Sequence, residues 1–183
     1  MTPGGIMKFA AIRPVLALTA CMLFLLGGIS VLPAAETAKK TDDSGWILPD
    51  SALGGDWHLR LKDARAEAAK DNKPILILFT GPDWSSASKK MESSIIRSKE
   101  FTASIRPAVV GLYIRHFVDA DAPEAQLESN SSLRKALNVP QVYPCTVLLG
   151  SDGKKILGIL PGLPEKKAYL EWIAGLAGIK LEK

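Results

Sequence analysis

The sequence is poor in cysteine and histidine. Its 183 residues include two of each, namely Cys21, Cys145, His58 and His116. No two of these residues stand at the spacing of a zinc site, and no acidic loop has the ligand pattern of a calcium site. The sequence therefore predicts no metal site and no cofactor.

Concentrated positive charge is also missing. The formal net charge is +4, and it falls to +2 when Lys8 and Arg13 at the N-terminal end are left out. No basic helix with interleaved aromatic residues follows them, which is the usual signal for a nucleic-acid partner. Nucleic acid is therefore not an expected partner.

A long apolar run stands near the beginning of the chain. Residues 15–31 are almost continuously apolar and residues 32–35 are mostly small, as in a secretory signal covering residues 1–35. The run is also nearly long enough to remain as a membrane anchor through residues 15–33. A third interpretation makes Cys21 the lipidated cysteine of a lipoprotein. All three predict an exported protein.

Export leaves few covalent options for stabilising the fold. After cleavage of residues 1–35, Cys145 is the only cysteine, so no internal disulfide can form. The remaining chain is long enough to depend on a hydrophobic core instead. We expect residues 36–55 to be a polar linker with one apolar docking patch at 46–49, and residues 56–183 to be the folded domain.

A buried strand followed by a sharp turn and a helix is the strongest structural signal. Ile75–Phe79 is unbroken apolar sequence, and Gly81-Pro82-Asp83 ends it. The next segment predicts a helix capped by Ser85 or Asp83, with a buried stripe at every fourth residue, formed by Ala87, Met91 and Ile95.

The other elements follow in alternation. Before the buried strand we expect a helix from Trp57 to about Lys70, capped by Asp56. After the motif helix we expect a capped turn over 98–105, a strand over 109–118, an exposed loop over 120–130 and a helix from Ser131 or Ser132 to Leu137. Hairpin strands over 146–149 and 155–160 follow, and Pro164 opens a last helix with Tyr169, Trp172, Ile173 and Leu176 on its buried side. This order predicts an α/β fold with a mixed sheet covered on both faces.

Two motifs resemble those of the thioredoxin superfamily. Trp84–Lys89 reads W-S-S-A-S-K and resembles the active-site motif W-C-x-x-C-K with both cysteines replaced by serine. Its lead-in, F-T-G-P-D-W, is similar to that of bacterial secreted thioredoxin-like proteins. Residues 139–149 and the turn at 151–154 resemble the segment that holds the cis-proline, which would be Pro144.

The resemblance runs roughly from Trp57 to Leu176. It implies a thioredoxin-like fold, with a central mixed β-sheet flanked by helices on both faces, a terminal β-hairpin and a C-terminal helix. It also implies a location in the bacterial periplasm or cell envelope.

The family's dithiol reaction is not expected here. It needs one activated thiolate and a second thiol that resolves the mixed disulfide, and serine hydroxyls can do neither. We expect Ser85 and Ser88 to be a helix cap and surface residues rather than catalytic groups. A serine nucleophile would need a base, and neither histidine stands near this turn in the chain. Enzyme activity is therefore not predicted.

A binding role fits the residues that remain. By resemblance, Pro82, Trp84, Tyr143 and Pro144 form an apolar groove in which thioredoxin-like proteins hold an extended peptide. The predicted function is binding of a protein or peptide whose identity the sequence does not give. The simpler alternative is that Trp84 only packs over the turn.

Cys145 supports a different hypothesis. A lone thiol beside the cis-proline could form a mixed disulfide with glutathione or a partner cysteine, which would make the chain a monothiol redox protein. The alternative is that Cys145, at the start of an apolar strand, is buried and inert. A third hypothesis is an architectural domain in an envelope complex. His116 alternates with apolar residues and is expected to be a core or edge histidine.

Overall fold

The computed structural model describes residues 40–53, 56–118 and 122–181. The predicted signal at 1–35, the alternative anchor at 15–33 and the lipidation site at Cys21 lie outside these ranges. Within the described ranges, no helix combines the length and the apolar character needed to cross a bilayer.

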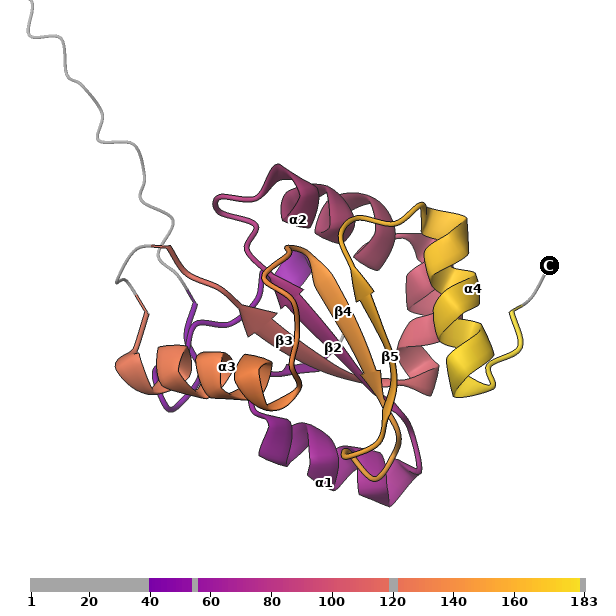
Figure 1. Ribbon diagram of the computed structural model, residues 1–183, viewed down its shortest axis with the longest axis horizontal. Coiled ribbons are helices and arrows are strands. Elements are labelled where there is room, and N and C mark those ends of the chain that lie inside the picture. Colours follow the sequence, from indigo (N-terminus) through magenta and orange to yellow (C-terminus); the bar gives the residue numbers. More distant parts are fainter. Residues whose placement is uncertain (1–39, 54–55, 119–121, 182–183) are drawn as a thin grey trace, which may run out of the picture. The chain divides into compact units, whose positions relative to one another are not determined.

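One mixed sheet forms the centre of the domain. Its strands are β1 (Trp57–His58), β2 (Ile75–Thr80), β3 (Val110–Arg115), β4 (Cys145–Leu149) and β5 (Ile156–Pro161), in the order β1-β3-β2-β4-β5. The first three in that order are parallel, while β4 and β5 run antiparallel to their neighbours (Figure 1). All six residues of the central strand β2 are buried.

In the described ranges four α-helices flank the sheet: α1 (Leu61–Asp71), α2 (Ser86–Met91), α3 (Glu124–Ala136) and α4 (Lys166–Ala177). The alternation along β2 separates two apolar clusters. Leu76 and Leu78 pack in the cluster that contains residues of α2 and α4. Ile75, Ile77 and Phe79 pack in the cluster that contains residues of α1 and against which Leu133 of α3 packs. The predicted α/β sheet with helices on both faces is confirmed.

The first predicted helix starts too early. Trp57 and His58 form β1, which pairs with β3, and α1 begins after Arg60 without a side-chain cap, so Asp56 caps nothing. Trp57 is buried and contacts Tyr113 edge-on, with ring centroids 6.2 Å apart. A strand of two residues is too short to show the alternation of apolar and polar residues that is typical of strands. The prediction therefore followed the helical spacing of the apolar residues after Trp57.

The predicted loop over 120–130 is wrong in its second half. A helix, α3, starts there after Pro123, and Ser131 and Ser132 are exposed residues in its interior rather than caps. The buried side of α3 is polar, because it carries Gln126, Asn130 and Arg134 at spacing four. A search for apolar periodicity cannot find such a helix.

The expected linker packs against the domain from residue 40 onward. Trp46 and Ile47 are buried, and the contacts of the chain group them with the compact unit. The backbone N–H of Ile47 donates to Gln126 Oε1 at 2.9 Å, and Gln126 Nε2 donates to the Ile47 carbonyl at 3.1 Å. The Arg60 guanidinium lies 3.9 Å from the Trp46 ring centroid. The apolar patch at 46–49 is therefore part of the fold.

Two helices have details that the prediction did not include. Helix α2 continues past Met91, as the predicted stripe to Ile95 requires, and it does so as a wider π-helical turn over Glu92–Ile96. Helix α4 begins after Glu165 rather than at Pro164, because the Glu165 carboxylate accepts a hydrogen bond from the Ala168 N–H. On α4, Tyr169 and Ile173 are buried as expected. Trp172 is only partly buried and Leu176 is exposed.

Candidate functional site

The two serines of the motif have structural roles at the turn between β2 and α2. Ser85 is the N-cap of α2, and its Oγ accepts a hydrogen bond from the Ser88 N–H at 3.2 Å. Ser88, which was expected to be a cap or a surface residue, is instead fully buried, and its Oγ accepts from the Gly81 N–H at 3.2 Å. Within the described residues, neither hydroxyl bonds to a histidine. The pair closes the turn and lacks a base.

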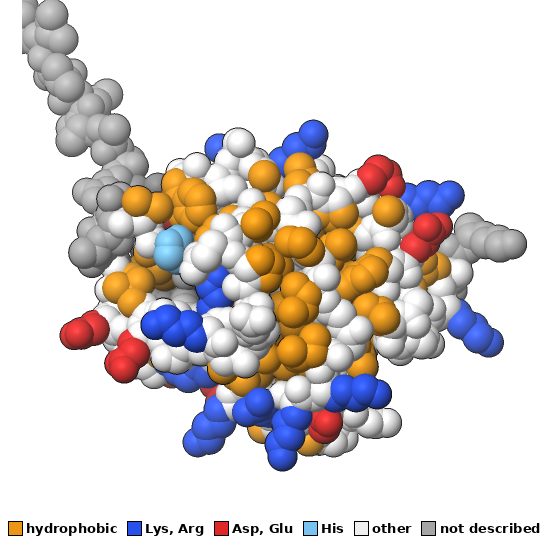
Figure 2. Space-filling view, in the orientation of Figure 1, with side chains coloured by type: hydrophobic (Ala, Val, Ile, Leu, Met, Phe, Trp, Pro, Cys, Tyr) orange, Lys and Arg blue, Asp and Glu red, His pale blue; other side chains and the backbone are white. Residues whose placement is uncertain are grey.

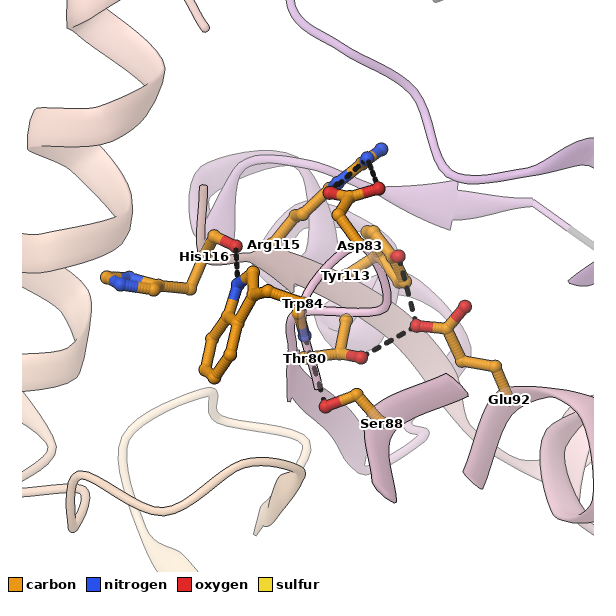
Figure 3. A network of polar contacts seen from close by, with 9 residues as sticks. Thr80, Asp83, Trp84, Ser88, Glu92, Tyr113, Arg115 and His116 are labelled. Carbon is orange, nitrogen blue, oxygen red and sulfur yellow. Dashed lines mark hydrogen bonds and ion pairs between the residues drawn. The ribbon is translucent and has the colours of Figure 1, made fainter. Parts of the chain in front are cut away.

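Trp84 and Asp83 attach this turn to the end of β3. Trp84 Nε1 donates to the His116 carbonyl at 3.0 Å, and Arg115 Nε donates to Asp83 Oδ2 at 2.9 Å (Figure 3). Asp83 is therefore an ion-pair partner and not the cap of α2. Trp84 keeps 43% of its surface exposed.

Three rings from separate segments meet here, and we call Trp84, His116 and Tyr143 the aromatic cluster. Trp84 stands edge-on to Tyr143, with centroids 5.1 Å apart, and to His116 at 5.7 Å. His116 stacks on Tyr143 at 5.1 Å. Burial, with a smaller contribution from the Arg134 charge, lowers the pKa of His116 below its usual value. Neutral imidazole is therefore the main form at pH 7.

His116 was expected to be a core or edge histidine and is instead an exposed member of the cluster. The signal that could have placed it is topological. His116 directly follows β3, which runs parallel to β2, and parallel neighbours bring their carboxyl ends to the same edge of a sheet. The motif turn follows β2 at that edge.

The proline loop forms the other side of the cluster. The Tyr143–Pro144 peptide bond is cis, and the Gly162 N–H donates to the Pro144 carbonyl at 2.8 Å. Within the described part of the chain, the backbone N–H and C=O of Tyr143 make no hydrogen bond. Pro144 itself is buried and Pro82 is half-buried. Of the four predicted groove residues, Trp84 and Tyr143 are in ring contact.

Arg134 supports the same loop from α3, and no sequence motif points to it. Its Nη2 donates to the carbonyls of Pro140 and Val142, the latter at 3.4 Å. Its guanidinium lies 4.2 Å from the Tyr143 ring centroid and 5.5 Å from that of Phe79. Only 6% of its surface is exposed. Arg134 therefore fixes the position of Tyr143.

Cys145 is fully buried as the first residue of β4, where it pairs with Phe79 and Pro161. Burial raises the pKa of its thiol to about 11, against a smaller opposite effect of the Arg134 charge. At neutral pH almost no thiolate is present, and thiolate is the form that reacts. This geometry disfavours the monothiol hypothesis.

Glu92 is a buried carboxyl group next to the motif helix, and sequence reasoning missed it. Its Oε1 accepts hydrogen bonds from Thr80 Oγ1 at 2.7 Å and from the Tyr113 hydroxyl at 3.1 Å (Figure 3). Burial raises its pKa, and the two hydrogen bonds oppose that effect only in part. In the described ranges no three acidic, histidine or cysteine residues are grouped to hold a metal.

The surface next to this site is apolar. Figure 2 shows hydrophobic side chains gathered in a band over β4 and β5, with charged side chains mainly around its margins. Strand β5 is the outer strand of the described sheet on this side. Exposed apolar side chains therefore extend beyond the aromatic cluster.

No protein-family model matches the chain, but individual proteins do. Disulfide bond reductase DsbH of Chlamydia pneumoniae is 31% identical over 137 residues, which cover 70% of this chain and 78% of DsbH. Thioredoxin-related protein DsbJ of the same organism is 23% identical over 128 residues. That match covers 70% of this chain but spans only about a third (34%) of the length of DsbJ.

Solved structures agree with these matches on the fold. The structure of a DsbH oxidoreductase superposes with a TM-score of 0.61 at 22% identity, covering 73% of this chain and 92% of that one. A thioredoxin from Thermus thermophilus gives a TM-score of 0.52 at 16% identity, covering 66% and 85%. The thioredoxin-like fold that the two motifs implied is confirmed.

Proposed function

This chain belongs to the thioredoxin-like superfamily together with DsbH, and from that premise we propose that it is an exported member without redox activity that binds an extended segment of another protein. The binding site is the groove beside Trp84 and Tyr143, and the location is the bacterial periplasm or cell envelope. No prosthetic group takes part.

The state of the cysteines supports the absence of dithiol chemistry. Serine occupies both motif positions, and both serines are engaged in closing the turn. The one cysteine in the described ranges is Cys145, which is buried and has a raised pKa. DsbH is named a disulfide bond reductase. This chain shares the fold and has no thiol at the two motif positions where such a reaction requires one.

The observation that carries the binding proposal is the unpaired backbone of Tyr143 next to the exposed Trp84 ring. An extended peptide can hydrogen-bond to that N–H and C=O as an added strand, and its side chains can contact the aromatic cluster. Tyrosine and tryptophan side chains provide large contact areas at low conformational cost. Because Trp84 and Tyr143 are held from behind by His116 and Arg134, the surface is formed before a ligand binds.

The test is a peptide array probed with the purified protein, followed by affinity measurement for the peptides it retains. We expect Trp84→Ala and Tyr143→Ala to weaken binding at least tenfold, because each removes an aromatic anchor. Leu176→Ala is the control, since Leu176 is an exposed apolar residue on α4. It should change affinity less than twofold. Binding by both aromatic variants at the parent's affinity would overturn the proposal, and turnover in an insulin-reduction assay would contradict the loss of redox activity.

A further inference from the structure

A cavity of about 240 Å³ lies beside the aromatic cluster, where the end of β3 faces α3 and the proline loop. Tyr143 and His116 belong to both the cluster and the cavity wall. The polar residues of the wall are Arg115, His116, Asn130, Ser131, Arg134 and Gln141. No aspartate or glutamate of the described chain lines it, so every charged side chain in the wall is an arginine.

The two arginines differ in their partners. Arg115 forms an ion pair with Asp83. Arg134 has no carboxylate partner in the described ranges, and its Nη2 donates only to backbone carbonyls. Its Nε and Nη1 are buried and have no hydrogen-bond partner there. A buried donor without a partner is unfavourable, and a buried cation without a counter-ion more so. Both nitrogens are enclosed by protein atoms, so the cavity wall gains from Arg134 a positive charge that has no counter-ion in the described ranges.

We propose that this cavity is a subsite for a carboxylate of the bound peptide, with Arg134 as its counter-ion. The proposal rests on the proposed peptide-binding function. A carboxylate in the cavity would supply the negative charge that this guanidinium lacks. Ser131 and Gln141, both exposed, supply further donors at the cavity wall.

The position of the carboxylate along the peptide follows from Tyr143. A peptide residue that pairs with the Tyr143 backbone sends its two neighbours to the same face, opposite to its own side chain. Because Tyr143 lines both the aromatic cluster and the cavity, a peptide paired with its backbone passes next to the cavity in a fixed register. Either an acidic side chain at the position that faces the cavity or the C-terminal carboxylate of a peptide that ends there would provide Arg134 with a counter-ion.

The experiment uses a positional library of heptapeptides in which each position in turn is Glu, Gln or Lys. Each peptide is made once with a free C-terminal carboxylate and once as the amide. We expect one position at which Glu binds about tenfold more tightly than Gln, or a similar preference for the free acid over the amide. The first result identifies an acidic side chain as the source, and the second identifies the chain terminus.

Three variants test whether the cavity is responsible. Arg134→Met should abolish the preference for the carboxylate, but Arg134 also holds the proline loop, so that variant could fold poorly. Ser131→Glu avoids this difficulty, because Ser131 is an exposed wall residue, and its new carboxylate should reduce the preference to below twofold. Ser132→Glu makes the same change of charge at the next position, outside the wall, and should leave the preference intact.

The outcomes separate the two proposals. Peptides that depend on Trp84 but bind equally well as Glu and Gln, and as acid and amide, would overturn the subsite alone. An undiminished preference in Ser131→Glu would do the same. Absence of binding by every peptide would overturn the proposed function and the subsite with it.

Discussion

Gly81 is the position at which one methyl group should disturb the whole site. A Cβ built there would lie 2.5 Å from the Cε2 and Nε1 atoms of the Trp84 ring, far inside contact distance. The ring would have to move, because the clash involves the body of the indole. Gly81→Ala should therefore break the hydrogen bond from Trp84 to the His116 carbonyl and separate Trp84 from its two ring partners.

The magnitude follows from those contacts. One hydrogen bond contributes ~1 kcal/mol, and each edge-to-face ring contact contributes ~0.5–1 kcal/mol at a partly exposed site. We therefore expect Gly81→Ala to lower the free energy of unfolding by ~2 kcal/mol, measured by urea denaturation. Gly175→Ala is the matched control, because a Cβ there meets nothing within 4 Å in helix α4. It should raise stability by ~0.5–1 kcal/mol.

A double-mutant cycle decides whether the explanation is correct. If the cost of Gly81→Ala comes from displacing the Trp84 ring, it should fall to near zero in a Trp84→Ala background. An equal cost in both backgrounds would refute the reasoning and would indicate a backbone effect at Gly81. Near-ultraviolet circular dichroism of the single variant should also change, because the environment of the indole changes.

Three further predictions concern buried groups. The pKa of Glu92 is raised in the folded protein, so ionisation of this carboxyl group opposes folding. The contribution of Glu92 to stability is therefore most favourable at or below its unfolded-state pKa of about 4.5, and it is lost as the pH rises through the folded-state pKa. Urea denaturation midpoints of Glu92→Gln and of the parent should be compared at pH 4.5, 6 and 7.5. The midpoint of the variant should increase relative to that of the parent as the pH rises, and a difference between the two midpoints that stays constant contradicts this. Iodoacetamide should label Cys145 no faster than the protein unfolds, and rapid labelling without urea would revive the monothiol hypothesis. Trp46→Ala should lower the free energy of unfolding by ~2–4 kcal/mol in calorimetry or urea denaturation, because Trp46 packs in the core; no change would show that this segment is a linker after all.

The parts of the fold that could be predicted are those whose sequence pattern is local. Ile75–Phe79 is apolar at every position because both faces of β2 are covered, and Ser85 caps α2 because it directly follows the turn. The start of α3 could not be predicted in this way. Its buried residues, among them Gln126, are polar and are satisfied by hydrogen bonds to segments far away in the sequence.

The residues of the site likewise divide into those that a local sequence pattern identifies and those that only the structure identifies. Trp84 and Tyr143 were found because each stands in a motif that resembles the superfamily. His116 and Arg134 join them only through the pairing of β3 with β2 and the packing of α3 beneath the proline loop. Both are long-range contacts between segments whose own sequences contain no motif. A single sequence read by periodicity carries no record of such contacts.

The polar face of α3 connects parts of the fold that lie far apart in the sequence. Gln126 holds the backbone of Ile47, Asn130 Nδ2 donates to the Arg115 carbonyl at 2.9 Å, and Arg134 holds the proline loop. Three backbone segments that are far apart in the sequence are thus hydrogen-bonded to successive turns of one helix. A shift of the backbone at Ile47 would have to be accommodated by α3, and the same helix carries the hydrogen bonds that hold the proline loop beside the aromatic cluster.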